Sequence, residues 1–217
     1  MGAAMIAGGI KDCLLIIVGT DECSYYTKSL TLSDHYGGIN GRWVSVVLNS
    51  HDVTFGSVES THKAFKEIVA EYRPKCVMLV TTCVIEVIGD DYDAIAEELT
   101  KQYSIPVMAV HTEHFKCEDH FPGFERAITA WQSIMQPQEC DGSVNVLGQR
   151  FGDFADTELY ALLTKSGVKI GVQLPSGCTS DDIRRAPAAK INIVVNDIAL
   201  PLAQAMHCLL YTSDAAD

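Results

Sequence analysis

Residues 75–98 read KCVMLVTTCVIEVIGDDYDAIAEE. Within this stretch, residues 76–82 form a continuous apolar and β-branched run after Pro74, which predicts a buried strand of a parallel sheet. Residues 90–103 then place their apolar side chains at helical spacing. The stretch therefore predicts a buried parallel strand that leads into a helix, with Cys83 at the junction between them.

The position of Cys83 makes it a candidate for a functional site. Open α/β sheets bind their ligands where the carboxyl ends of strands meet the amino ends of helices. A thiolate at this point, or an anionic cofactor held by it, would lie near the positive end of a helix, which favours negative charge and lowers the pKa of a thiol. Position alone leaves a second interpretation open, in which Cys83 is a buried and inert cysteine.

Two further cysteines follow predicted strands. Residues 13–18 and residues 105–112 are apolar runs that predict strands, and Cys23 and Cys117 lie in the segments after them. Right-handed connections would make the three strands parallel neighbours, whose carboxyl ends meet at one edge of one sheet. The sequence therefore predicts that the thiols of Cys23, Cys83 and Cys117 gather at that edge.

The composition limits the location and the partners of the protein. The chain has 217 residues, of which 47% are hydrophobic, so a core large enough for one or two domains is expected. A net charge of −12 argues against nucleic-acid and anionic-membrane partners. No apolar run approaches the roughly 20 residues that a membrane span needs. The eight cysteines include no C-x-x-C pair, and no secretory signal precedes them, which predicts a reducing, cytoplasmic location.

The order of predicted elements indicates two α/β units. Residues 1–140 are expected to form a first domain that carries the three cysteines, and residues 143–207 form part of a second, in which strands and helices again alternate. The polar segment 136–143 is the expected linker. The second domain contains neither a G-x-G-x-x-G motif nor a Walker lysine loop, so no nucleotide site is expected there.

The last residues are expected to be foreign to the protein. Residues 208–217, CLLYTSDAAD, match in all ten positions the translation of a common transposase sequencing adapter. They are therefore interpreted as read-through and are left out of fold reasoning. On this interpretation the sequence is a fragment, and the biological chain continues beyond His207.

Four motifs carry a resemblance to a known family. The run TTCVIEVIGDD at residues 81–91 resembles the T-T-C-x-x-E-V-I-G-D-D motif of nitrogenase component 1 type proteins, in the form found in their β subunits. Residues 2–26 are similar to the G-A…G…H-G-x-x-G-C-x-x-Y segment of that family, residues 52–56 to its D-x-x-F-G-G, and residues 144–148 to its V-N-[IV]-x-G. The resemblance covers residues 2–207 and implies parallel-sheet, Rossmann-like domains in a protein of roughly twice this length.

The resemblance implies a redox subunit. Members of the family pair as dimers of related subunits, and an iron-sulfur cluster at the interface receives electrons from an ATP-dependent iron-sulfur reductase protein. Cys23 and Cys83 match two of the three cluster ligands of the family, which implies a 4Fe-4S or larger cluster shared with a partner subunit. Gly19 and Gly89 lie in the same motifs and are expected to border the cofactor.

The motifs also depart from the family pattern. The first cluster cysteine of the family would lie just upstream of Gly2, where this sequence has only Met1. Val18 stands at the position of the histidine in the H-G pair, and Glu22 stands at the position of the glycine before the second cysteine. These changes indicate a nitrogenase-like branch rather than nitrogenase itself.

Cys117 has more than one interpretation. It falls in the loop where β-type nitrogenase subunits place a serine near their cluster, so the resemblance implies that Cys117 can serve as a further ligand. Alternatively, His111, His114, Cys117 and His120 follow one another at a spacing of three and offer four ligands for zinc. Structural zinc usually takes two close pairs instead, which favours surface or proton-relay roles for the histidines. A loop thiol without a partner is the remaining interpretation.

Three functions are consistent with the sequence. The leading hypothesis is an N-terminal fragment of a nitrogenase-like oxidoreductase, which relays low-potential electrons through an interface cluster to a substrate or cofactor bound deeper. The second is a non-catalytic scaffold or carrier that binds a metal-cluster or tetrapyrrole precursor. The third is a metal-free α/β binding domain that has kept the fold and lost the cluster.

Overall fold

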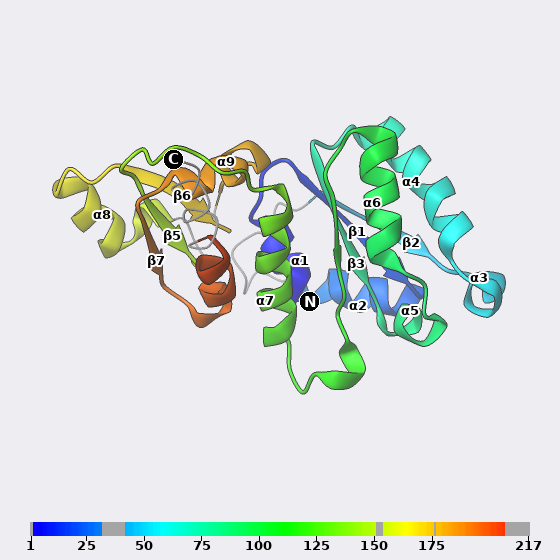
Figure 1. Cartoon of the computed structure of the whole chain (residues 1–217). Helices are drawn as coiled ribbons and strands as arrows, with labels where there is room; N and C mark the ends of the chain where they lie inside the picture. Colours follow the sequence, from blue (N-terminus) through cyan, green and yellow to red (C-terminus); the bar gives the residue numbers. More distant parts are fainter. Residues whose placement is uncertain (1, 32–41, 151–153, 176, 207–217) are drawn as a thin grey trace.

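Two parallel sheets form the framework of the computed structural model, which describes residues 2–31, 42–150, 154–175 and 177–206 (Figure 1). The larger sheet has the strand order β2-β1-β3-β4 and the smaller sheet the order β6-β5-β7, and all of these pairings are parallel. The predicted α/β class is therefore confirmed. The strands are β1 (Cys13–Gly19), β2 (Arg42–Val47), β3 (Cys76–Thr81), β4 (Val107–Val110), β5 (Val144–Leu147), β6 (Ile170–Leu174) and β7 (Ile191–Val194).

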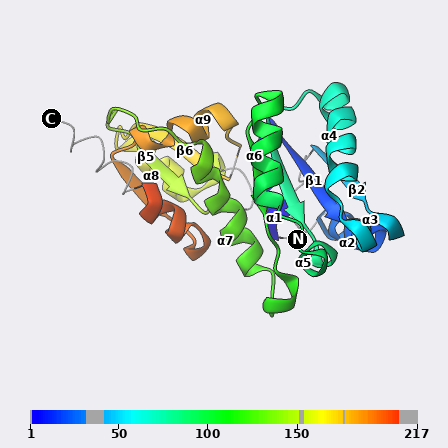
Figure 2. The same ribbon diagram turned by 45° about the vertical axis from the view of Figure 1, so that its right-hand side comes forward.

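Helices cover both faces of the larger sheet. Figure 2 shows α4 and α6 on one face and α1 and α7 on the other, between the two sheets. Within the described ranges, no helix is long and apolar enough to cross a membrane. The helices are α1 (Gly2–Gly8), α2 (Asp21–Thr31), α3 (Ser50–Phe55), α4 (Val58–Tyr72), α5 (Cys83–Ile88), α6 (Tyr92–Tyr103), α7 (Phe121–Ala130), α8 (Glu158–Lys165) and α9 (Ser180–Arg185), with short 3-10 turns such as η2 (His114–Lys116) and η3 (Trp131–Ile134) and a last helix over 200–206.

The two central strands bury side chains on both faces of the sheet. Every residue of β1 and β3 is buried, as their continuous apolar sequences predicted. Successive side chains point to opposite faces of a strand, so the strands contribute to two separate clusters. Leu14 and Leu79 pack with α4 and α6, whereas Leu15 and Met78 pack with α1 and α7. The second cluster also contains Leu147 of the smaller sheet. The two units therefore share this hydrophobic cluster.

The helix after β3 differs from its prediction. The sequence predicts one helix from residue 90, but α5 already begins at Cys83 and α6 begins at Tyr92. Gly89 ends α5 with a φ of +82°, a left-handed conformation that glycine adopts without strain. Asp91 then caps α6, because its carboxylate accepts a backbone hydrogen bond at 3.0 Å.

Other boundaries shift by a few residues. The sequence predicts a loop over residues 19–23, but α2 begins at Asp21, so the Cys23 thiol lies in the first turn of a helix. The predicted strand 105–112 is shorter, because only Val107–Val110 pairs with β3. Pro122 and Gly123 predict the start of a helix that reaches about residue 135, but α7 ends at Ala130 and continues as the 3-10 turn η3. The glycine-rich segment 36–41, which predicts a loop, lies outside the described residues.

A hydrogen-bonded contact joins the larger sheet to the smaller one. Asp12, just before β1, accepts hydrogen bonds from the backbone N–H and from the hydroxyl of Ser180 at the start of α9, both at 2.7 Å. Nearby, the Lys11 N–H donates to the carbonyl oxygen of Cys178 at 2.9 Å. Ser180 is buried, so these bonds are shielded from water. The Asp12 carboxylate therefore fixes α9 against the base of β1.

Substituting Asp12→Ala should lower the free energy of unfolding by about 2 kcal/mol, because two hydrogen bonds to a carboxylate are lost and Ser180 stays buried. Chemical denaturation followed by circular dichroism measures the change. Asp181→Ala is the matched control, since this neighbouring carboxylate is exposed and its removal should change the free energy by about 0.5 kcal/mol or less. Equal effects of the two substitutions would contradict the role of the Asp12 carboxylate in holding α9 against β1.

Candidate functional site

Two thiols meet at the carboxyl edge of the larger sheet. The Sγ atoms of Cys23, in the first turn of α2, and Cys83, the first residue of α5, are 3.9 Å apart. Both side chains are half-buried. The sequence predicted that the two thiols share this edge, and the parallel pairing of β1 with β3 is what brings them together. Cys23 and Cys83 are called the thiol pair below.

Gly19 allows the ends of β1 and β3 to approach closely. A Cβ atom at Gly19 would lie 1.9 Å from the Thr82 Oγ1 atom, so no larger residue fits without movement. The Thr82 N–H also donates to the Val18 carbonyl oxygen at 3.1 Å. Gly89 has a different role, because a Cβ there would meet no atom within 4 Å and only its backbone conformation requires glycine. The expected roles of Gly19 and Gly89 beside a cofactor stay predictions.

The pKa of the Cys83 thiol is raised rather than lowered, contrary to the prediction from its place at a helix start. Burial is the main cause, followed by the Coulombic effect of the neighbouring Cys23 and a hydrogen bond with it. Backbone N–H groups of Val84 and Cys83 act in the opposite direction but do not outweigh these effects. A cation bound between the sulfurs would reverse the balance, because it favours both thiolates.

Two residues adjacent in sequence to the thiol pair carry buried hydroxyl groups without a hydrogen-bond partner among the described residues. They belong to Ser24, which follows Cys23, and to Thr82, which precedes Cys83. Within the described part of the chain, only Thr129 and Trp131 have other buried side-chain atoms in this condition. Buried polar groups normally have a partner, so these hydroxyls are exceptions to the usual pattern.

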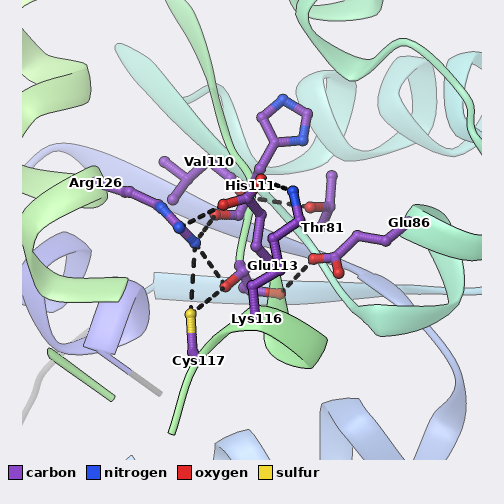
Figure 3. Close-up of polar contacts among 9 residues, drawn as sticks. Thr81, Glu86, Val110, His111, Glu113, Lys116, Cys117 and Arg126 are labelled. Atoms are coloured by element: carbon purple, nitrogen blue, oxygen red, sulfur yellow. Dashed lines mark hydrogen bonds and ion pairs between the residues drawn. The ribbon is translucent and has the colours of Figure 1, made fainter. Parts of the chain in front are cut away.

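Cys117 does not join the thiol pair. Its Sγ atom lies 3.6 Å from the Thr112 carbonyl oxygen, to which it donates, and 3.8 Å from Nη1 of Arg126, as Figure 3 shows. Across the described residues, no group of three or more histidine, cysteine, aspartate or glutamate side chains is arranged to hold a metal ion. The role of Cys117 as a third ligand therefore stays a prediction, without support from this arrangement.

Arg126, which the sequence analysis did not single out, organises the loop around Cys117. Its guanidinium donates to the carbonyl oxygens of His111 and Thr112 and pairs with the Glu113 carboxylate (Figure 3). Lys116, and then Arg126, lower the pKa of Glu113, which has a left-handed φ of +43°. Arg126 lies in no recognisable sequence motif. Only its position on one face of the helix α7 could have indicated that it contacts the loop.

The zinc interpretation of this loop finds no support. The His111 ring lies 3.1 Å from the Asp93 carboxylate, and the His120 ring packs on Phe121 and Phe124. The histidines thus contact separate parts of the molecule, and the side chain of His114 lies outside the described residues.

Several exposed apolar side chains lie at the same end of the larger sheet as the thiol pair. They belong to α2, β2, α3 and α5, which Figure 1 shows at one end of that sheet. They are Tyr25, Tyr26, Val47, Phe55 and Val87, with exposed fractions between 52% and 76%. Exposed apolar and aromatic side chains are enriched in protein interfaces.

The thiol pair fits part of the ligand set of an iron-sulfur cluster. Such clusters take four cysteine thiolates, and the two sulfurs here are close enough to face one group. Two thiolates complete neither a cluster nor a tetrahedral zinc site.

The fold and the thiol pair together define an α/β protein with parallel sheets and a cysteine site at the carboxyl edge of one sheet. The sequence model of the "Nitrogenase component 1 type Oxidoreductase" family matches residues 1–208. The chain belongs to this family.

Known relatives are distant and longer. A nitrogenase iron-molybdenum cofactor biosynthesis protein NifE from Clostridium pasteurianum is 32% identical over 199 residues, which cover 89% of this chain and 43% of the relative. A nitrogenase molybdenum-iron protein alpha chain from the same organism is 28% identical over 200 residues, which cover 88% of this chain and 38% of the relative. The solved structure of nitrogenase Cp1 at pH 5 superposes with a TM-score of 0.80 at 24% identity, over 95% of this chain and 45% of that one. The chain thus spans less than half the length of these relatives.

Substituting Gly19→Ala should destabilise the protein by about 2 kcal/mol, because the new Cβ atom overlaps the buried Thr82 side chain. Thermal and chemical denaturation measure the effect. Gly123→Ala on α7 is the matched control, since a Cβ there would meet its nearest atom at 3.5 Å and should change the free energy of unfolding by about 0.5 kcal/mol or less. A Gly19→Ala protein as stable as wild type would contradict the close approach.

In the reduced protein, alkylation of Cys83 by iodoacetamide should rise with pH to a midpoint above 9.0, the ordinary value of a thiol pKa. The thiolate is the reacting form, and a raised pKa leaves less thiolate at neutral pH. Mass spectrometry of the labelled peptides gives the rates. In a Cys23→Ser background the midpoint should move down, because the neighbouring thiol is one cause of the raised pKa. A midpoint below 9.0 in the wild-type protein would be inconsistent with this electrostatic account.

Proposed function

We propose that the chain is part of a subunit of a nitrogenase-like oxidoreductase, in which Cys23 and Cys83 bind an iron-sulfur cluster at an interface between subunits. The observation that carries the proposal is the 3.9 Å separation of the two sulfurs at the carboxyl edge of a parallel sheet. Family membership and the similarity to a nitrogenase alpha chain support the redox chemistry. When bound, the cluster would accept and donate single electrons at low potential.

The chain itself would hold and shield the group. The two thiols approach from separate helices, so the rigid sheet, rather than a loop, fixes their separation. The N–H groups of Cys83 and Val84 face the Cys83 sulfur and favour its thiolate. The half-buried position of both thiols limits the access of water, which suits a group that transfers electrons.

A second subunit would complete the site. The exposed apolar side chains at this end of the sheet are suited to cover by a protein partner, and the partner would supply the missing ligands. A related nitrogenase-like subunit is the proposed partner, and an ATP-dependent iron-sulfur reductase is the proposed source of electrons. Family membership supports both proposals.

A scaffold for cofactor assembly is the second candidate. The similarity to proteins named for iron-molybdenum cofactor biosynthesis, one of them 32% identical, favours it. The two functions differ in the fate of the bound group. A redox subunit would keep its cluster through repeated reduction and oxidation, whereas a scaffold would transfer a bound precursor to a cluster-free acceptor protein. Iron analysis of the protein after incubation with such an acceptor distinguishes them.

The proposal is tested by metal analysis of the full-length protein, purified anaerobically with its partner subunit. Wild type should contain iron and acid-labile sulfide, and Cys83→Ala should reduce both severely, because one of the two converging thiolates is lost. Cys140→Ala is the control, since this cysteine is exposed and should leave the iron content unchanged. Iron-free wild-type protein would refute the redox and scaffold proposals together. Cys117→Ala decides the remaining prediction, because a third ligand would also lose iron on substitution.

A further inference from the structure

The thiol pair offers a metal ion two sulfur ligands and, within the described part of the chain, no third ligand. The sulfurs of Cys23 and Cys83 face each other, and no group of three or more histidine, cysteine, aspartate or glutamate side chains there is arranged to hold a metal ion. We propose that the thiol pair forms a two-coordinate site for a soft monovalent cation of the Cu(I) class. This site needs neither the proposed cluster nor a second subunit.

The number and the type of the ligands select the ion. Zinc takes four ligands in its structural sites, and calcium and magnesium take oxygen ligands, so two thiolates satisfy none of these ions. Thiolate sulfur is a soft ligand that favours Cu(I). A monovalent ion with a filled d shell is stable with two such ligands. On binding, each thiol releases its proton to water and the ion stays Cu(I), so the step needs no oxidant or reductant.

The separation of the two sulfurs is close to what such an ion requires. The Sγ atoms of Cys23 and Cys83 are 3.9 Å apart. A bond between a metal ion and a thiolate sulfur is about 2.3 Å long, so an ion midway between two sulfurs needs them about 4.6 Å apart. Small rotations of the two side chains supply the difference. Both thiols are half-buried, so the ion can reach them from solvent.

Carboxylates close to the thiols in sequence favour a cation. Asp21 and Glu22 lie in the first turn of α2, as Cys23 does. Glu86 lies in the first turn of α5, which begins at Cys83. Negative charge of this kind raises the local concentration of cations. Glu22 stands where the family pattern has a glycine, so part of this charge is particular to this chain.

A second pair of cysteines provides a comparison within the same chain. Cys13 and Cys76 are register partners at the amino ends of β1 and β3. They are 3% and 0% exposed, so both are shielded from solvent. The half-buried pair at the carboxyl edge should therefore bind the ion, and the buried pair should not.

The experiment titrates the full-length protein with Cu(I) in competition with bathocuproine disulfonate, after metal has been removed by chelation and while the thiols are kept reduced without oxygen. Cys23→Ser and Cys83→Ser should each lose one bound Cu(I) per chain, with an affinity lowered by more than about 100-fold, the upper range for residues that only orient a ligand. Cys140→Ser, which removes an exposed single thiol, and Cys76→Ala should bind as wild type does. X-ray absorption at the copper edge should show two sulfur neighbours.

Several results would overturn the inference. One is a wild-type protein that retains no more Cu(I) than Cys83→Ser. Another is a copper ion with three sulfur neighbours, or loss of copper in Cys117→Ala, because either would show a different ligand set. Circular dichroism checks that the serine variants are folded, and the copper-edge spectrum of wild type decides the question without them if they are not. Iron and sulfide analysis tests the proposed function separately, so either proposal can fail while the other stands.

Discussion

The contact between Gly19 and Thr82 is the constraint on which the thiol pair depends. Only a residue without a side chain lets the Thr82 hydroxyl lie against the end of β1, and the hydrogen bond from the Thr82 N–H to the Val18 carbonyl oxygen extends the pairing of β1 with β3 to this point. Immediately beyond it, the chain turns into α2 on one side and α5 on the other. Both thiols follow within the first turn of these helices, so the backbone of the sheet sets their separation of 3.9 Å.

The same edge carries features that are energetically unfavourable in the folded chain. Burial and the proximity of the two thiols raise the pKa of Cys83, and the hydroxyls of Ser24 and Thr82 have no partner among the described residues. The two central strands of the larger sheet, β1 and β3, are by contrast apolar and buried between helices, as their sequences predict. Unfavourable local features in an otherwise well-packed fold are typical of functional sites.

The strands could be predicted from the sequence because a continuous apolar run indicates a strand that is buried on both faces. Cys13 and Cys76 begin such runs and prove to be register partners, which places Cys23 and Cys83 together at the other edge. The helix boundaries could not be predicted as well, because α5 depends on a left-handed glycine and α2 begins before the expected helix. The surroundings of the thiol pair and of Cys117 were beyond sequence reasoning, since they depend on packing between residues distant in the chain.

Cys117 illustrates that a shared sheet edge does not by itself make a shared site. The thiols of the pair follow their strands closely, whereas Cys117 comes seven residues after β4 ends, and the loop between is held by Arg126. To reach the thiol pair, the Cys117 sulfur would have to leave the guanidinium and the Thr112 carbonyl oxygen. The apolar side chains on α2, α3 and α5, by contrast, are already exposed at the same end of the larger sheet as the pair. Under the proposed function, completing the ligand set from a second subunit therefore requires less rearrangement of this chain than recruiting its own third thiol from that loop.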